Sequence, residues 1–160
     1  MLALCDALRA CRTLTRLELR LNPAEGTTRR VVAELLDAAA SLPVLSTLDL
    51  SRSRIQDAAA FGHALCALLA ANLPSLRFLD VQSCHLGDEG LGPLLDGLAA
   101  NTHLRRLDCR IQNDLSEAFE RDRLEPAMTE LAARRERDAQ RAACNQPRRT
   151  PIARPLPGAC

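Results

Sequence analysis

A pattern of the Leu-x-x-Leu-x-Leu type occurs four times in this chain, with Val81 and Cys109 as the last residue of the third and fourth copies. This pattern limits the possible folds more than any other feature of the sequence. The four copies begin at Leu14, Leu45, Leu76 and Leu104, so the first leucine recurs after 31, 31 and 28 residues. Recurrence at a period of a few tens of residues is typical of repeat proteins, in which each unit stacks on the next. The sequence therefore predicts a solenoid of about four units.

Each copy of the pattern alternates apolar with other residues, as a half-buried β-strand does. Between the copies, apolar residues fall at positions i, i+1 and i+4, which share one face of an α-helix. These triplets are Leu4/Cys5/Leu8, Leu35/Leu36/Ala39, Leu65/Cys66/Leu69 and Leu94/Leu95/Leu98. Because helices are wider than strands, the stack must curve. We expect an α/β right-handed horseshoe with a concave parallel sheet of about four strands and convex helices.

The third unit resembles a leucine-rich repeat of the ribonuclease-inhibitor type. Its strand and turn (76–86), its helix start (87–91) and the stretch before the next strand (99–104) follow the order of that family. The resemblance covers about residues 1–131, and it implies a horseshoe that binds other proteins. Ran GTPase-activating proteins and the sensor arms of innate-immune receptors carry the same unit.

The turn after each strand departs from the family in two units. Members of the family place Asn or Cys there to bond the neighbouring loop, and this chain has Asn22, Ser53, Cys84 and Gln112. Asn113 lies one residue later than the family pattern requires, which predicts a one-residue insertion in the fourth unit.

The chain is expected to contain a leucine-rich repeat domain over residues 1–143 and a Pro/Arg-rich, extended or disordered tail over 144–160. A helical cap is expected over about 116–143. Pro126 would divide this cap into helices at about 116–123 and 125–143, because proline lacks the backbone N–H that a helix needs.

The first helix has no strand before it and no polar capping unit. Either this helix is itself the cap, or another subunit or a missing portion of the protein covers it. The open N-terminal edge is therefore a second candidate docking surface.

Composition excludes several classes of function. The seven cysteines are an odd number and no stretch resembles a signal peptide, which favours a reduced, cytoplasmic protein without disulfides. No apolar run is long enough to cross a membrane. With 2% aromatic residues, the chain lacks the stacking groups typical of nucleic-acid binding. The three histidines show no metal-ligand spacing, and no cofactor motif is present, so neither a metal nor a cofactor is expected.

The alternation of each strand predicts three columns of side chains on the concave face. The middle column is entirely acidic. The columns are Arg16/Thr47/Phe78/Arg106, Glu18/Asp49/Asp80/Asp108 and Arg20/Ser51/Gln82/Arg110.

Arginines flank the two outer acids of the middle column, so Asp49 and Asp80 are expected to be unpaired, beside Phe78. In one interpretation this face binds the basic, partly apolar surface of a partner. In the other, the acids only keep the face soluble. The candidate binding residues are Arg16, Glu18, Arg20, Asp49, Phe78, Asp80, Gln82, Arg106, Asp108 and Arg110.

An open sheet face offers no pocket for acid–base catalysis, so we expect a non-enzymatic interaction or scaffold protein. It would bind protein partners through the concave face, the N-terminal edge or both, as a possible subunit of a larger complex. The stretch 107–127 resembles repeats of large leucine-rich families in flagellated protists, which suggests a cytoskeletal or ciliary assembly. Two alternatives remain open, namely a small-GTPase regulator resembling Ran GTPase-activating proteins and a truncated, non-functional paralogue.

Overall fold

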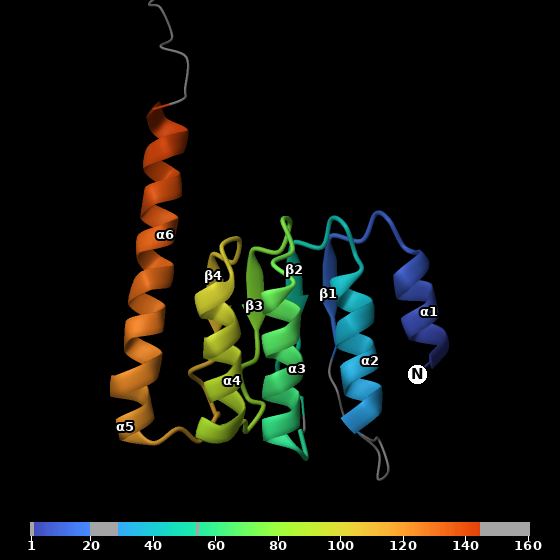
Figure 1. The fold of residues 1–160 in the computed structure, drawn as a ribbon, viewed down its shortest axis with the longest axis horizontal. Helices are drawn as coiled ribbons and strands as arrows, with labels where there is room; N and C mark the ends of the chain where they lie inside the picture. The colour runs from blue at the N-terminus through green and yellow to red at the C-terminus, as the bar shows by residue number, and fades with distance from the viewer. Residues whose placement is uncertain (1, 20–28, 54, 145–160) are drawn as a thin grey trace, which may run out of the picture.

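The computed structural model describes residues 2–19, 29–53 and 55–144 (Figure 1). Strands and helices alternate through the repeats, and a long helix follows the last strand. The elements are α1 (Leu2–Ala10), β1 (Arg16–Glu18), α2 (Arg29–Ala40), β2 (Thr47–Asp49), α3 (Ala58–Ala70), β3 (Phe78–Asp80), α4 (Gly87–Ala100), β4 (Arg106–Asp108), α5 (Glu117–Phe119), η1 (Glu120–Leu124) and α6 (Glu125–Cys144). Arg20 and the tail residues 145–160 lie outside the described residues.

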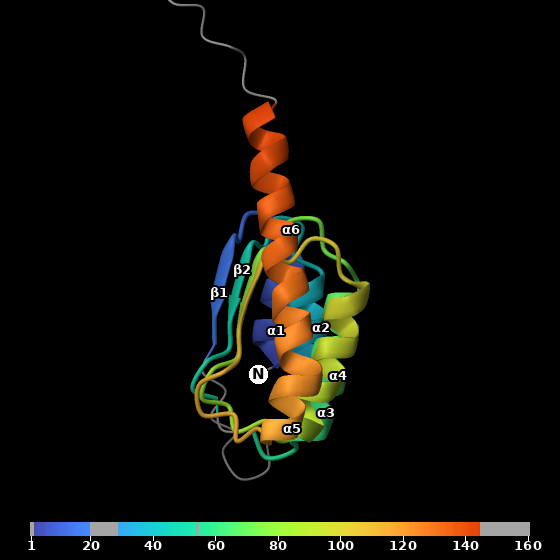
Figure 2. The same cartoon turned by 90° about the vertical axis from the view of Figure 1, so that its left-hand side faces the viewer.

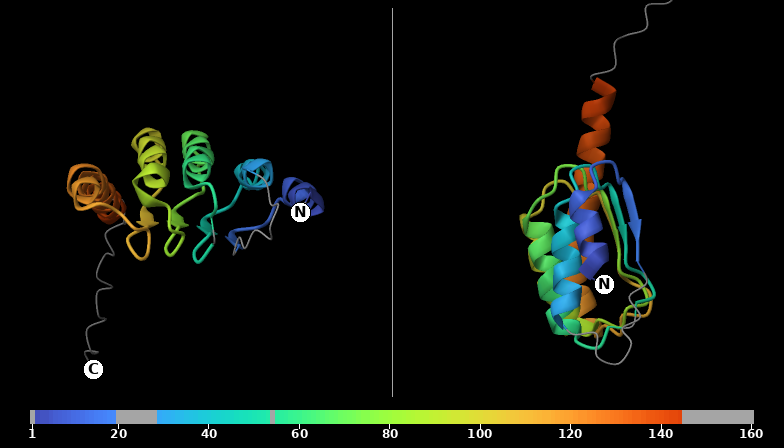
Figure 3. Two further views of the ribbon diagram at one scale, coloured as in Figure 1. Left: turned by 90° about the horizontal axis from the view of Figure 1, so that it is seen from below. Right: turned by 90° about the vertical axis from the view of Figure 1, so that its right-hand side faces the viewer.

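The four strands form one parallel sheet in the order β1-β2-β3-β4. The helices form a second layer that arches over one side of the sheet (Figure 3). The central leucine of each strand pairs in register with that of the next and points into the core: Leu17, Leu48, Leu79 and Leu107. The predicted α/β solenoid with a parallel four-stranded sheet is confirmed.

Leucine side chains fill most of the space between the two layers. The helix triplets are buried in α2 and α4, but the first triplet is only partly buried. Leu4 remains 38% exposed, whereas Cys5 and Leu8 are buried. The helical face that carries this triplet is therefore only partly covered in α1. This helix is at the end of the stack, and among the described helices it packs on α2.

Helices α3 and α4 approach each other through glycines. A Cβ atom on Gly62 would lie 2.1 Å from the carbonyl oxygen of Gly90, and one on Gly97 would lie 2.8 Å from the Cα of Cys66. Real Cβ atoms do not come this close to backbone, so these positions require glycine unless the helices move apart. Close backbone approach is one of the few reasons to retain glycine inside a helix despite its low propensity.

Buried asparagines connect successive loops at the two ends of the strands. Asn101 donates to the carbonyl of Leu69 at 2.8 Å and accepts from the backbone N–H groups of His103 and Leu104. This repeat is thereby bonded to the one before it. Buried backbone groups in loops need such partners because water cannot reach them.

Asn113 makes the corresponding link beyond β4. It accepts from the N–H groups of Cys84 and Leu86 and donates to the carbonyls of Val81 and Cys109. Gln112, at the position expected from the repeat, is exposed and has a left-handed backbone with φ of 50°. The fourth unit therefore contains an extra residue, and Asn113 takes the buried position.

The C-terminal helices form one continuous helical segment. The expected interruption at Pro126 is instead a π-helical turn, η1, in which the N–H of Glu125 donates to the carbonyl of Glu120. Pro126 has no N–H to offer to the preceding turn, and a wider turn before it accommodates the loss. Cys144, expected in the tail, is the last residue of α6.

Helix α6 begins against the last repeat and continues past the end of the other helices (Figure 1, Figure 2). Of its residues 125–144, all of which the structure describes, only Leu131 is buried. None of the described helices is both long enough and apolar enough to span a membrane.

Candidate functional site

The face of the sheet opposite the helices carries two of the predicted columns in register. Consecutive strands pair residue by residue, so each side chain lies beside its counterpart in the next repeat. The pairs run Arg16–Thr47–Phe78–Arg106 in the first column and Glu18–Asp49–Asp80–Asp108 in the second. In the third column, Ser51, Gln82 and Arg110 follow the strand ends, and Arg20 lies outside the described residues.

Arginines neutralise the outer acids of the middle column. Arg16 donates from Nε to Glu18. Arg106 binds Asp108 in bidentate fashion, with Nε 3.0 Å from Oδ1 and Nη2 2.6 Å from Oδ2. Arg110 was also expected to flank Asp108, but it pairs with another residue. Its guanidinium lies 3.6 Å from Oε1 of Glu125, at the start of α6.

Asp49 and Asp80 form the centre of the column, and neither has an ion pair with an arginine of the described segments. Oδ1 of each carboxylate accepts a 2.9 Å bond from a backbone N–H two residues later, that of Ser51 or Gln82. These bonds hold the side chains in position but do not supply a positive charge. Two adjacent carboxylates thus face the open side of the sheet.

Partial burial raises the pKa of the Asp80 carboxyl above its ordinary value. The negative charges of Asp49 and Asp108 raise it further, while the Gln82 N–H and Arg106 act in the opposite direction. The raised pKa means that the neighbouring positive charge and hydrogen bond do not fully offset the free-energy cost of ionising Asp80 in the free protein. A cation brought by a partner would lower the cost of keeping this carboxylate ionised.

Phe78 and Arg106 form a stacked pair beside the acids. The guanidinium carbon of Arg106 lies 4.7 Å from the centroid of the Phe78 ring, within the range of a cation–π contact. Phe78 is half-buried. Arg106 therefore contacts both Phe78 and Asp108, and it joins the aromatic group to the acidic column.

The buried thiols behave as packing groups. Burial raises the pKa of Cys84 to about 11 and that of Cys109 to about 12. Such thiols carry almost no thiolate at neutral pH and are poor nucleophiles. Within the described ranges, no three His, Cys, Asp or Glu side chains gather in a way that could hold a metal ion.

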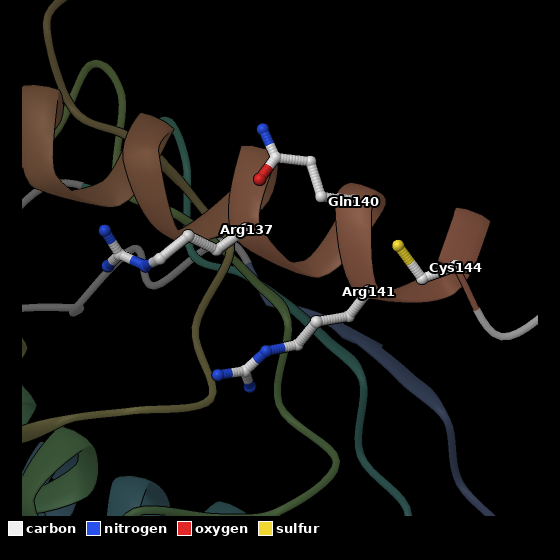
Figure 4. A pocket seen from close by; sticks show the side chains of 4 residues that line it. All are labelled: Arg137, Gln140, Arg141 and Cys144. Carbon is white, nitrogen blue, oxygen red and sulfur yellow. The ribbon is translucent and has the colours of Figure 1, made fainter.

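A second surface lies on the projecting half of α6. Four side chains line a shallow hollow on one face of this helix: Arg137, Gln140, Arg141 and Cys144 (Figure 4). The sequence indicated only a helical cap over about residues 116–143. The spacing i, i+3, i+4 and i+7 was the signal that could have found this surface, because it places the four residues on one helical face.

A family model described as "Leucine Rich repeat" matches residues 72–95. This stretch contains β3 and the first part of α4, and the same strand–helix unit recurs along the sheet. The chain is a leucine-rich repeat protein. No match to a curated protein sequence was found.

Solved structures with the same fold match most of the length of this chain. One is "Leiomodin-1 Actin-Binding Site 2 (ABS2)", with a TM-score of 0.68 and 16% identity, covering 89% of this chain and 95% of that one. Another is the tropomodulin C-terminal domain from Caenorhabditis elegans, with a TM-score of 0.51 and 16% identity, covering 89% and 98%. At this identity the likeness shows the fold alone.

Proposed function

We propose that this protein is a non-enzymatic protein-binding module whose sheet face docks a basic, partly apolar surface of a partner. One observation carries the proposal: Asp49 and Asp80 lie side by side on an open face with no arginine partner among the described residues. Like charges on neighbouring strands repel each other, and a cation from a partner would convert this repulsion into attraction.

Phe78 supports the same face as an apolar contact. Binding energy at protein interfaces is concentrated in a few central residues, with aromatic and arginine side chains enriched among them. Phe78 and Arg106 lie directly beside the acidic pair. The remaining predicted residues would form a polar rim: Arg16, Glu18, Arg20, Gln82, Asp108 and Arg110.

A cytoskeletal partner is part of this proposal, and actin is the first to test. One solved structure with this fold is an actin-binding site of leiomodin-1, and that property belongs to leiomodin-1. A cytoplasmic location within a cytoskeletal assembly would follow. The open N-terminal edge stays a second candidate docking surface, and the division into a repeat domain over residues 1–143 and a tail over 144–160 stays a prediction.

The test is co-sedimentation of the purified protein with actin filaments, together with a binding titration against monomeric actin. We expect Asp80→Arg and Phe78→Ala each to weaken binding about tenfold or more, as loss of a central contact does. The matched control is Glu89→Arg, which makes the same charge change on an exposed residue of α4. Glu89→Arg should bind like the wild type.

Two results would separate the parts of the proposal. Absence of actin binding would reject actin as the partner. Affinity capture from native cells with the same three variants would then test the face itself. If Asp80→Arg, Phe78→Ala and Glu89→Arg all retain the same captured proteins as the wild type, the sheet face is not the docking surface.

A further inference from the structure

The projecting half of α6 is an ordered helix with an exposed, positively charged face. Arg134 donates to the carbonyl of Asn101, and Asp138 accepts from Arg105, so α6 contacts the last repeat as far as Asp138. Every residue from 139 to 144 is exposed, in the part of α6 that projects from the body of the protein (Figure 1). Arg137 and Arg141 lie one turn apart on this face, with Gln140 and Cys144 beside them (Figure 4). A helix extension of this kind buries little of its own surface and is accessible to a partner.

The charge of the chain is divided between its two parts. Residues 1–133 carry 14 arginines and 18 acids, whereas residues 134–160 carry 7 arginines and 2 acids. Arg141 has no carboxylate partner within the described residues. Arg137 pairs with Glu130 at 2.8 Å, and both side chains are about half exposed. Exposed ion pairs contribute little stability, so Arg137 can exchange this partner for another.

Two possible occupants of this face are disfavoured by geometry and charge. Antiparallel pairing with the same face of another α6 would bring arginines against arginines, which repel. Docking on the sheet face of the same molecule is prevented because α6 points away from the sheet along the direction of the strands (Figure 2).

The spacing of the two arginines matches that of Asp49 and Asp80. Side chains at i and i+4 on a helix are about 5–6 Å apart, and residues on neighbouring strands are about 4.8 Å apart. Arg137 and Arg141 could therefore each face one carboxylate of the Asp49–Asp80 pair, with the helix lying across β2 and β3.

We propose that the Arg137–Arg141 face of α6 docks on the Asp49–Asp80 pair of a second copy of this chain, so that copies associate head to tail. The inference rests on the proposed function, since it uses the same sheet face and names its partner. The two surfaces in such a contact are different, so an assembly of any length still has a free sheet face at one end and a free α6 face at the other. A heterologous contact of this type extends to an open chain unless its rotation closes a ring.

Sedimentation velocity of the full chain tests this. At about 0.05 M salt we expect the sedimentation coefficient to rise with protein concentration, and at about 0.5 M salt the rise should be lost because the contact is ionic. Arg141→Glu removes the helical surface and Asp80→Arg removes the sheet surface. Each variant alone should be monomeric, with association weakened at least about tenfold. Glu89→Arg should associate like the wild type.

Mixing the two deficient variants gives the sharpest result. Asp80→Arg still has an intact helix and Arg141→Glu still has an intact sheet face, so one contact between them remains possible. The mixture should form a one-to-one dimer that does not grow further. The milder Asp80→Asn, which can still accept the Gln82 N–H bond, should also weaken association if Asp80→Arg does so through charge and not through misfolding.

A wild-type protein that stays monomeric at low salt would overturn the inference, and so would association that is unchanged in both variants. Loss of binding to another acidic protein in Arg141→Glu, without self-association, would overturn it as well. Failure of the head-to-tail contact can be distinguished from failure of the proposed function. If a partner still binds the wild type and is lost only with Asp80→Arg, the sheet face binds protein and the head-to-tail contact alone is rejected.

Discussion

The guanidinium of Arg106 stacks 4.7 Å from the centre of the Phe78 ring and at the same time binds Asp108 with two nitrogens. One side chain thus links the aromatic and acidic columns across β3 and β4. Arg106 also covers part of the ring that a partner would contact. The apolar surface offered by Phe78 is consequently smaller than an isolated phenylalanine would offer.

This stacked pair should be measurable as a coupling energy. A double-mutant cycle with Phe78→Leu and Arg106→Ala, followed by urea unfolding, should give about 0.5–1 kcal/mol, the usual range for an exposed cation–π contact. Arg16→Ala is the matched control because Arg16 also pairs with the acid two residues later but has Thr47 as its neighbour. Coupling between Phe78 and Arg16 should be close to zero. Equal coupling in both cycles would argue against the stacked pair.

Asn113 is expected to be the most sensitive polar residue of the last repeat. Its side chain makes four hydrogen bonds to backbone groups of two repeats in a buried site. Asn113→Ala leaves buried groups without partners, and each such group costs about 1–3 kcal/mol. We expect a loss of about 2–4 kcal/mol in the free energy of unfolding.

Gln112→Ala is the control for Asn113→Ala. Gln112 is exposed, and glutamine and alanine both place a Cβ at the same left-handed position, so the change should stay within about 0.5 kcal/mol. If Gln112→Ala were the more destabilising of the two, the buried position would belong to Gln112. Urea unfolding of both variants decides between them.

The buried position of Asn113, one residue later than the repeat requires, could be anticipated from the sequence. Strand spacing predicted an insertion in the fourth unit, and the structure places Asn113 in the buried position one residue later. The columns on the sheet were likewise predictable because side chains alternate with a period of two along a strand. The partner of Arg110 was not predictable. Glu125 is distant in the sequence, and only the path of the C-terminal helices brings it to Arg110.

Gly62→Ala should destabilise the protein although alanine is the better helix former. The added Cβ would lie 2.1 Å from the Gly90 carbonyl oxygen, so α3 and α4 would have to separate. Overpacking of this kind costs about 1–3 kcal/mol or more. Thermal or urea unfolding measures the loss.

Gly92→Ala in α4 provides the opposite expectation. The nearest atom to its Cβ, apart from its own helix, is Phe119 Cε2 at 3.8 Å, an ordinary contact. Alanine should therefore stabilise α4 by about 0.5–1 kcal/mol. If Gly62→Ala and Gly92→Ala changed the free energy of unfolding equally, helix propensity would determine both effects, and the close approach of α3 and α4 would not. The sequence could not distinguish Gly62 from Gly92, because close approach is a property of the packed helices.

The raised pKa of Asp80 predicts how stability changes with pH. The folded protein holds this proton more tightly than the unfolded chain does, so the Asp80 contribution to the free energy of unfolding decreases as pH rises from about 3.9, the unfolded value, through the raised folded value. Asp80→Asn should therefore be more stable than the wild type at neutral pH. The advantage should fade in acid, where the carboxyl is protonated.

An NMR titration of the Asp80 carboxyl carbon provides the direct measurement. Its midpoint should lie above that of an ordinary aspartate in the wild type, and Asp49→Asn should move it downward because one neighbouring negative charge is removed. Partial burial contributes the largest share of the shift, so the midpoint should stay raised in Asp49→Asn. A midpoint that is unchanged by Asp49→Asn would mean that the two carboxylates do not interact, and the paired acidic centre would lose its electrostatic basis.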